Sequence, residues 1–240
     1  MPVARVNGID LHYEEIGEGP HLVVAHGLKG SVATLPLFGE RIDAIAARGV
    51  HVIAYDARGH GRSGYTAVTL ALDHPETVEK LILQSPPPTG VYLRRVRPMF
   101  LGLAMLVQVV GPRTTGRIVA RLPRRHAASG FDISAFIGGQ RRAAIVPAVR
   151  GLLRGPPLPI HRYGEIRQPA LVLAHPDDPI HPLASGELLH ERMPHAKLAV
   201  APAPTYWAEN PDGLAFIVAA FVRGEQIARG LPGHGSSRIS

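Results

Sequence analysis

Residues 52–63 read VIAYDARGHGRS, and this stretch decides how the rest of the 240-residue chain is interpreted. An apolar run ends at Asp56, a turn containing Gly59 and Gly61 follows, and helical spacing begins at residue 68. A short apolar run that passes through glycines into a helix is typical of a strand in a mostly parallel sheet. The stretch therefore predicts an α/β domain.

Strand and helix signals continue on both sides of this stretch. Asn7-Gly8 predicts an antiparallel hairpin over residues 3–15, because both turn residues tolerate positive φ. The nearly continuous apolar run at residues 21–26 predicts a strand that is covered on both faces. Further strands are expected at residues 50–56, 80–85, 170–175 and 197–201, and helices at residues 38–47, 68–74, 184–193 and 213–222. The fold class is therefore α/β: a mostly parallel sheet with an N-terminal antiparallel hairpin and helices on both faces.

The alternation of strands and helices stops in the middle of the chain. After three prolines at residues 86–88, helical segments separated by Gly and Pro continue to about residue 160. This stretch is interpreted as a helical cap. The expected organisation is an N-terminal core part at residues 1–90, the cap at 91–160, a C-terminal core part at 161–226 and a flexible tail at 227–240.

Positive charge is concentrated in the expected cap. Residues 91–160 contain twelve Arg, no Lys and one acidic residue, Asp132, which gives a net charge of +11, whereas the remainder of the chain carries −4. One interpretation is an ordinary solvated surface. The other is an electropositive lid that attracts small anionic ligands or an acidic membrane surface. Nucleic acid is not expected as a partner, because aromatic residues are sparse around the arginines and no binding motif occurs.

Composition narrows the classes of protein further. The chain has no cysteine, which excludes disulfides and thiolate zinc sites. The N-terminus lacks an apolar segment of signal-peptide length, and the longest apolar stretch, residues 99–110, is too short to span a bilayer. A soluble cytoplasmic protein without a cofactor is expected, and its oligomeric state stays open.

Several short motifs together resemble one known family. They are residues 22–27 (LVVAHG), residues 52–63, residues 73–83 (DHPETVEKLIL), residues 171–182 with Asp177-Asp178-Pro179, and residues 209–211 (ENP). This combination resembles the α/β hydrolase family, especially its capped esterase, lipase and epoxide-hydrolase-like members. The resemblance implies hydrolysis of esters or related small apolar substrates.

The resemblance also assigns roles to residues. Asp178 occupies the position of the catalytic acid, and Gly27 and Leu28 lie in the loop that supplies an oxyanion-hole amide. Each residue also has a structural interpretation: Asp178 as a cap for nearby loop amides, and Gly27 as a tight turn after a strand. Asp56 is expected to hold the following glycine turn by hydrogen bonds.

The nucleophile and the catalytic histidine of the family are not found. The family presents its serine in a G-x-S-x-G elbow, and this motif occurs nowhere in the 240 residues. Where the family has its histidine, this chain has Pro204, Thr205, Tyr206 and Trp207. Only 23 residues separate Asp56 from Lys80, enough for one crossover but not for two crossovers with a strand between them. The central nucleophile strand is therefore expected to be missing, so that the strands on either side pair directly or lack a partner.

The sequence offers less support for other functional sites that could replace the missing serine and histidine. Ser63, with His60 as a base, is a candidate nucleophile, and Ser85 is a weaker one. Residues 59–64 fit G-x-G-x-x-G, but Gln84 stands where a dinucleotide site needs a carboxylate. A metal cluster at residues 175–181 is disfavoured by its two prolines. The sequence thus predicts a catalytically impaired hydrolase; the alternative is a non-catalytic protein that binds a ligand or an acidic membrane.

Overall fold

A computed structural model gives the structure of the chain. It describes residues 2–6, 8–26, 31–38, 40–56, 63–86, 91–121, 133–139, 142–143, 145–147, 149, 160–178 and 181–227. Gly27, Leu28, His60 and the predicted tail lie outside these residues.

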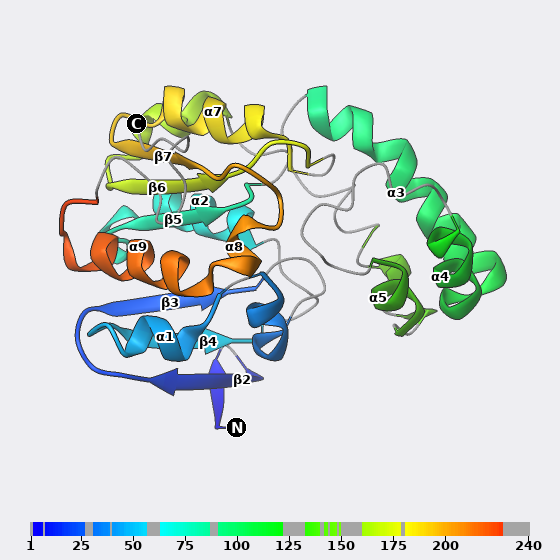
Figure 1. Cartoon of the computed structure of the whole chain (residues 1–240), viewed down its shortest axis with the longest axis horizontal. Coiled ribbons are helices and arrows are strands. Elements are labelled where there is room, and N and C mark those ends of the chain that lie inside the picture. Colours follow the sequence, from blue (N-terminus) through cyan, green and yellow to red (C-terminus); the bar gives the residue numbers. More distant parts are fainter. Residues whose placement is uncertain are drawn as a thin grey trace.

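The N-terminal part of the chain forms a four-stranded sheet in the order β1-β2-β4-β3 (Figure 1). Its strands are β1 (Val3–Val6), β2 (Ile9–Ile16), β3 (His21–Ala25) and β4 (His51–Tyr55). β1 and β2 pair antiparallel, and Gly8 between them has φ 77°, which confirms the predicted hairpin. β2 is antiparallel to β4, and β4 is parallel to β3.

The C-terminal part forms a second, wholly parallel sheet in the order β5-β6-β7. Its strands are β5 (Leu81–Gln84), β6 (Ala170–Ala174) and β7 (Ala196–Val200). All five residues of β6 are buried, as expected for a central strand with helices on both faces. Among the described residues, one α-helix, α2 (Ser63–Asp73), and a short 3-10 turn, η2 (Pro75–Thr77), lie between β4 and β5, in agreement with the predicted single crossover.

The two sheets are not joined by a strand ladder. β3 pairs only with β4 and β5 only with β6 among the described strands, so each has one edge without a strand partner. The prediction that residues 21–26 would be covered on both faces is wrong, because Val23 is 62% exposed. β3 is an edge strand, and Val23 belongs to none of the described apolar clusters, whereas Leu22 and Val24 on the opposite face of the strand pack against one.

The described helices cover one face of both sheets and the other face of the second sheet. On one face lie α1 (Ile42–Ala46), α8 (Tyr206–Glu209) and α9 (Pro211–Arg223); on the other lie α2, α7 (Leu183–Arg192) and the 3-10 segment η4 (Ile160–Glu165). Alternate residues of β6 point to the two faces: Leu171 packs in the cluster with α9, and Val172 packs in the cluster with α2 and α7. The sequence placed a helix at residues 38–47, but Arg41 is extended, so α1 begins only at Ile42. A 3-10 segment, η1 (Val32–Phe38), precedes it.

Helix α9 connects the two sheets. Its residues Leu214, Ile217 and Phe221 belong to one apolar cluster with Val52 of the first sheet and Leu171 of the second. The cluster continues across the break between β3 and β5, and Figure 1 shows α9 in front of this region. Apolar burial, not backbone pairing, therefore holds the two sheets together.

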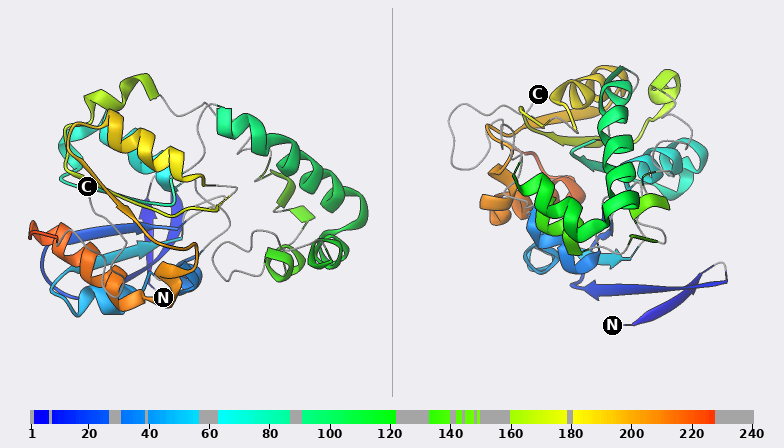
Figure 2. Two further views of the ribbon diagram at one scale, coloured as in Figure 1. Left: turned by 45° about the horizontal axis from the view of Figure 1, so that its top comes forward. Right: turned by 90° about the vertical axis from the view of Figure 1, so that its right-hand side faces the viewer.

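The predicted cap contains helices and, in its described residues, no strand. It consists of α3 (Val91–Val110), α4 (Pro112–Ala120) and α5 (Ile133–Gly139), which project from the core at the carboxyl side of β5 and β6 (Figures 1 and 2). The cap has an apolar cluster of its own that includes Val96, Phe100 and Ile137. At Gly116 a Cβ would lie 2.5 Å from the Ser134 carbonyl oxygen, so α4 and α5 can approach this closely only with glycine there. No helix in the described parts of the chain has the length and apolar character needed to cross a membrane.

Shortening a side chain of α9 tests the connection between the sheets. Ile217→Ala is expected to lower the free energy of unfolding by about 2–5 kcal/mol, because Ile217 is 1% exposed and the cavity lies inside the shared cluster. Trp207 is the only tryptophan and belongs to the same cluster, so its fluorescence during urea unfolding provides the measurement. Phe216→Ala is the control, since Phe216 is 49% exposed and its loss should cost no more than about 0.5 kcal/mol. Equal effects of the two substitutions would contradict the bridging role of α9.

Glu40 gives the stability a pH dependence. Burial of this carboxyl group between η1 and α1 raises its pKa from the ordinary 4.5 to about 7. The folded state then holds a proton that the unfolded state releases, so the free energy of unfolding should fall by about 1–3 kcal/mol as pH rises from about 4.5 to about 7, and stay level above. Urea unfolding at a series of pH values checks this. Glu40→Gln should abolish the fall, whereas Glu79→Gln, at a side chain that is 91% exposed, should leave it unchanged.

Candidate functional site

Polar side chains gather where the parallel strands end. His26 follows β3, Asp56 follows β4, Ser85 follows β5, and the segment from His175 to Asp178 follows β6. The arrows of β3, β5 and β6 point toward the side of the core that carries the cap (Figure 1). In open α/β sheets this is the edge at which ligands bind. The carboxyl edge is therefore the candidate site.

Asp56 fixes the loop that follows β3. Its Oδ1 accepts a hydrogen bond from the backbone N–H of Val32 at 2.7 Å, and His26 Nε2 lies 3.9 Å from the same oxygen. His26 is only 3% exposed. Asp56 therefore holds the start of η1, while the glycine turn that it was expected to hold lies outside the described residues.

Asp178 lies in the loop after β6, at the predicted position of the catalytic acid. Its Oδ1 accepts the backbone N–H of His181 at 2.9 Å, and its Oδ2 lies 3.0 Å from the imidazole Nδ1 of the same residue. His175 Nε2 approaches Oδ2 to 3.7 Å. The Asp178 side chain is 9% exposed, so a nearly buried carboxylate lies between two imidazoles.

The contact between Asp178 and His181 has the form of a catalytic acid–histidine pair. A carboxylate that accepts Nδ1–H fixes the tautomer and orientation of the ring and leaves Nε2 for chemistry. His181 is 36% exposed at its side chain, so the ring reaches solvent. Sequence reasoning missed this pairing, because it considered His181 only as part of a metal cluster. The signal was present as a histidine three residues after the aspartate, a spacing that one loop can close.

The structure says less about the other predicted site residues. Gly27, Leu28 and His60 are not described, and Ser63 is placed only as the first residue of α2. At the family's histidine position, Tyr206 and Trp207 are both 2% exposed and their rings pack edge to face with centroids 4.9 Å apart. Within the described residues, no three or more His, Asp or Glu side chains are grouped to hold a metal ion.

Ser85 has a strained backbone at the end of β5. Its φ is 47°, a left-handed conformation that is uncommon for a residue other than glycine, and its N–H donates to the Leu173 carbonyl at 2.9 Å. A strained residue at a strand end is how the hydrolase elbow exposes its serine. The two imidazoles of the loop after β6 have other contacts: His175 Nδ1 lies 3.1 Å from the Pro176 carbonyl oxygen, and His181 Nδ1 lies 3.0 Å from Asp178 Oδ2.

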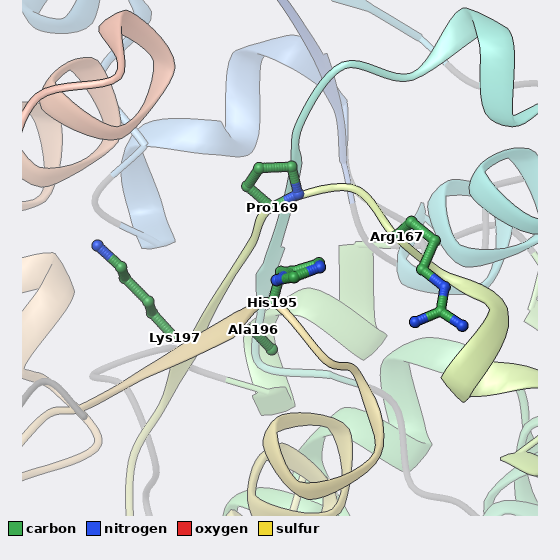
Figure 3. A pocket seen from close by; sticks show the side chains of 5 residues that line it. All are labelled: Arg167, Pro169, His195, Ala196 and Lys197. Atoms are coloured by element: carbon green, nitrogen blue, oxygen red, sulfur yellow. The ribbon is translucent and has the colours of Figure 1, made fainter.

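A separate basic pocket lies at the opposite edge of the second sheet. It is a shallow depression of about 540 Å³ lined by Arg167, Pro169, His195, Ala196 and Lys197 (Figure 3). Arg167 and Pro169 precede β6 and His195 precedes β7, so the pocket is at the amino ends of these strands. It contains none of the predicted site residues.

Removal of the Asp178 carboxylate should destabilise the loop. Asp178→Ala leaves the His181 backbone N–H and imidazole N–H without their acceptor, so the free energy of unfolding should fall by about 1–3 kcal/mol in urea titrations. The control is Asp177→Asn at the neighbouring, exposed position, where φ is 59° and asparagine tolerates the left-handed backbone. A loss no greater than that of the control would contradict the anchoring role of Asp178.

Comparisons with known proteins agree with this architecture. No family model matches the chain. The sequence is 26% identical over 221 residues to a non-heme haloperoxidase of Rhodococcus erythropolis, covering 90% of this chain and 70% of that protein. It is 41% identical over 61 residues to an epoxide hydrolase of Caballeronia sordidicola, covering 25% of this chain and 18% of that protein.

Solved structures show the fold. The enol-lactonase of Burkholderia xenovorans superposes with a TM-score of 0.71 at 20% identity, covering 92% of this chain and 100% of that one. An esterase of Exiguobacterium antarcticum gives a TM-score of 0.71 at 15% identity, covering 92% and 98%. This chain is therefore an α/β hydrolase-fold protein.

Proposed function

We propose that this protein is a catalytically impaired hydrolase that retains binding of small apolar esters or related substrates. The substrate class follows from the resemblance to capped esterases and epoxide-hydrolase-like proteins. Structural similarity to an enol-lactonase and an esterase supports the same class. The impairment is inferred from residues of this chain.

The break between the two sheets is the observation that carries the proposal. In the family the strand that presents the nucleophile lies between the counterparts of β3 and β5. Here β3 and β5 have no strand between them in the described chain, and Val23 is 62% exposed on β3. A serine elbow needs a strand end from which to project, and the strands in the described part of the chain offer none at this position.

The sequence supports the same conclusion. G-x-S-x-G is absent, and the segment that holds the family's histidine contains the buried rings of Tyr206 and Trp207. Acyl transfer through a serine needs the hydroxyl and the imidazole together, because the base removes the proton as the bond forms. Loss of such a pair lowers kcat by roughly 10⁶-fold in a well-studied serine protease. Gly27 and Leu28 remain proposed as the oxyanion loop.

One observation favours a second function, a rebuilt general-base site. Asp178 and His181 are paired through Nδ1 at 3.0 Å, which is the arrangement that prepares an imidazole to accept a proton at Nε2. Such a pair can activate water against an ester without a serine. In this case hydrolysis is slow but depends on both residues.

Ester hydrolysis and a serine-directed probe distinguish these functions. We expect no labelling of the folded protein by a fluorophosphonate, and turnover of p-nitrophenyl acetate no faster than with the same concentration of free imidazole. An inert p-nitrophenyl ether should still raise the melting temperature, because a ligand that binds only the folded state stabilises it. Labelling of Ser63 or Ser85 would contradict the proposal.

The variants His181→Gln and Asp178→Asn decide between impairment and a rebuilt base. Turnover that falls in both variants, but not in the control His190→Gln, indicates the rebuilt site. His190 is a suitable control because its Nδ1 contacts the Ala196 carbonyl oxygen at 2.9 Å on α7, away from the loop after β6. Equal background rates in all four proteins support the impaired protein.

A further inference from the structure

Helix α3 carries an apolar stripe on its outer face. Leu101, Met105 and Val109 follow one another at intervals of four residues and are 50%, 71% and 68% exposed. Residues at this spacing lie on one side of a helix. The opposite side packs into the cap cluster through Val96, Phe100 and Val107. The helix is therefore apolar on both sides, a pattern typical of a helix that is covered all round.

The two helices at this end of the cap, α3 and α4, carry exposed arginines and no acidic residue. Between Val91 and Arg121 the chain has no acidic residue, and its exposed arginines are Arg94, Arg95, Arg97, Arg113, Arg117 and Arg121. Arg94 lies seven and eleven residues before Leu101 and Met105, which places it on the same face of α3. Arg113, Arg117 and Arg121 belong to α4 and its C-terminal end. Helix α4 packs against α3 (Figure 2).

We propose that this face of the cap binds the surface of a membrane that contains anionic lipids. Leu101, Met105 and Val109 would enter the boundary between head groups and acyl chains, and the arginines would pair with lipid phosphates. The stripe extends over about 12 Å along the helix, which suits a helix that lies parallel to the membrane plane. This proposal does not depend on the proposed function, because it uses no residue of the candidate site.

The charge distribution favours a membrane over a protein partner. A second copy of this chain would bring the same arginines against each other, and like charges at an interface oppose association. An anionic bilayer offers an apolar layer for the stripe and negative charge for the exposed arginines of α3 and α4.

Co-sedimentation of the full chain with vesicles provides the test. We expect binding to vesicles of equal parts phosphatidylcholine and phosphatidylglycerol, little binding to phosphatidylcholine alone, and weaker binding as salt is raised. The double variant Arg94→Ser with Arg97→Ser should bind roughly tenfold more weakly, because each arginine near an acidic surface contributes to the attraction. Arg167→Ser is the matched control at an exposed arginine of the core and should bind like the unaltered chain.

Substitutions in the stripe separate insertion from simple charge attraction. Met105→Gln with Val109→Gln should weaken binding roughly fivefold or more, because two of the three apolar side chains of the stripe no longer partition into the boundary region. Phe216→Gln, at an apolar side chain of α9 that is 49% exposed, should leave binding unchanged.

Three outcomes would overturn the proposal: vesicle binding that does not change with lipid charge or salt concentration, stripe variants that bind like the unaltered chain, or no binding to vesicles at all. Sedimentation velocity gives a further check. Self-association that Met105→Gln with Val109→Gln abolishes, without vesicle binding, would assign the stripe to a second copy and overturn it as well.

Discussion

The fold depends on the contact between α9 and the two sheets. Parallel strands in one sheet normally hold each other through backbone ladders, but no ladder crosses from β3 to β5 in the described chain. The apolar cluster around Ile217 holds the two sheets together instead, since it includes Val52 from one sheet and Leu171 from the other. Because apolar burial has no preferred direction, it fixes the separation of the sheets less strictly than hydrogen bonds would.

This constraint explains the state of the carboxyl edge. Each sheet is followed by one aspartate that accepts a backbone N–H: Asp56 after β4 accepts from Val32 in the segment after β3, and Asp178 after β6 accepts from His181 in its own loop. Both carboxylates thus hold a backbone segment in place by a hydrogen bond, whether or not catalysis occurs. The two aspartates therefore belong to different sheets, on either side of the break between β3 and β5.

The sequence predicted local elements well and burial less well. The hairpin at Gly8, the strands and the helices of the cap are set by spacing and turn residues, which act over a few positions. The exposure of Val23 depends on what packs over its face of the sheet, a property that its own apolar run does not encode. The pairing of Asp178 with His181 was missed for a related reason: the loop conformation, not residue type alone, brings Nδ1 to the carboxylate.

The edge of β3 has a consequence for the protein at high concentration. Its five residues, HLVVA, include no proline and no lysine, the residues with which proteins usually guard a sheet edge. Such an edge is a template on which another extended chain can add, so partly opened molecules would assemble strand by strand. A single lysine facing outward in place of Val23 would act as a gatekeeper, because a charge must lose its water before a new strand can dock.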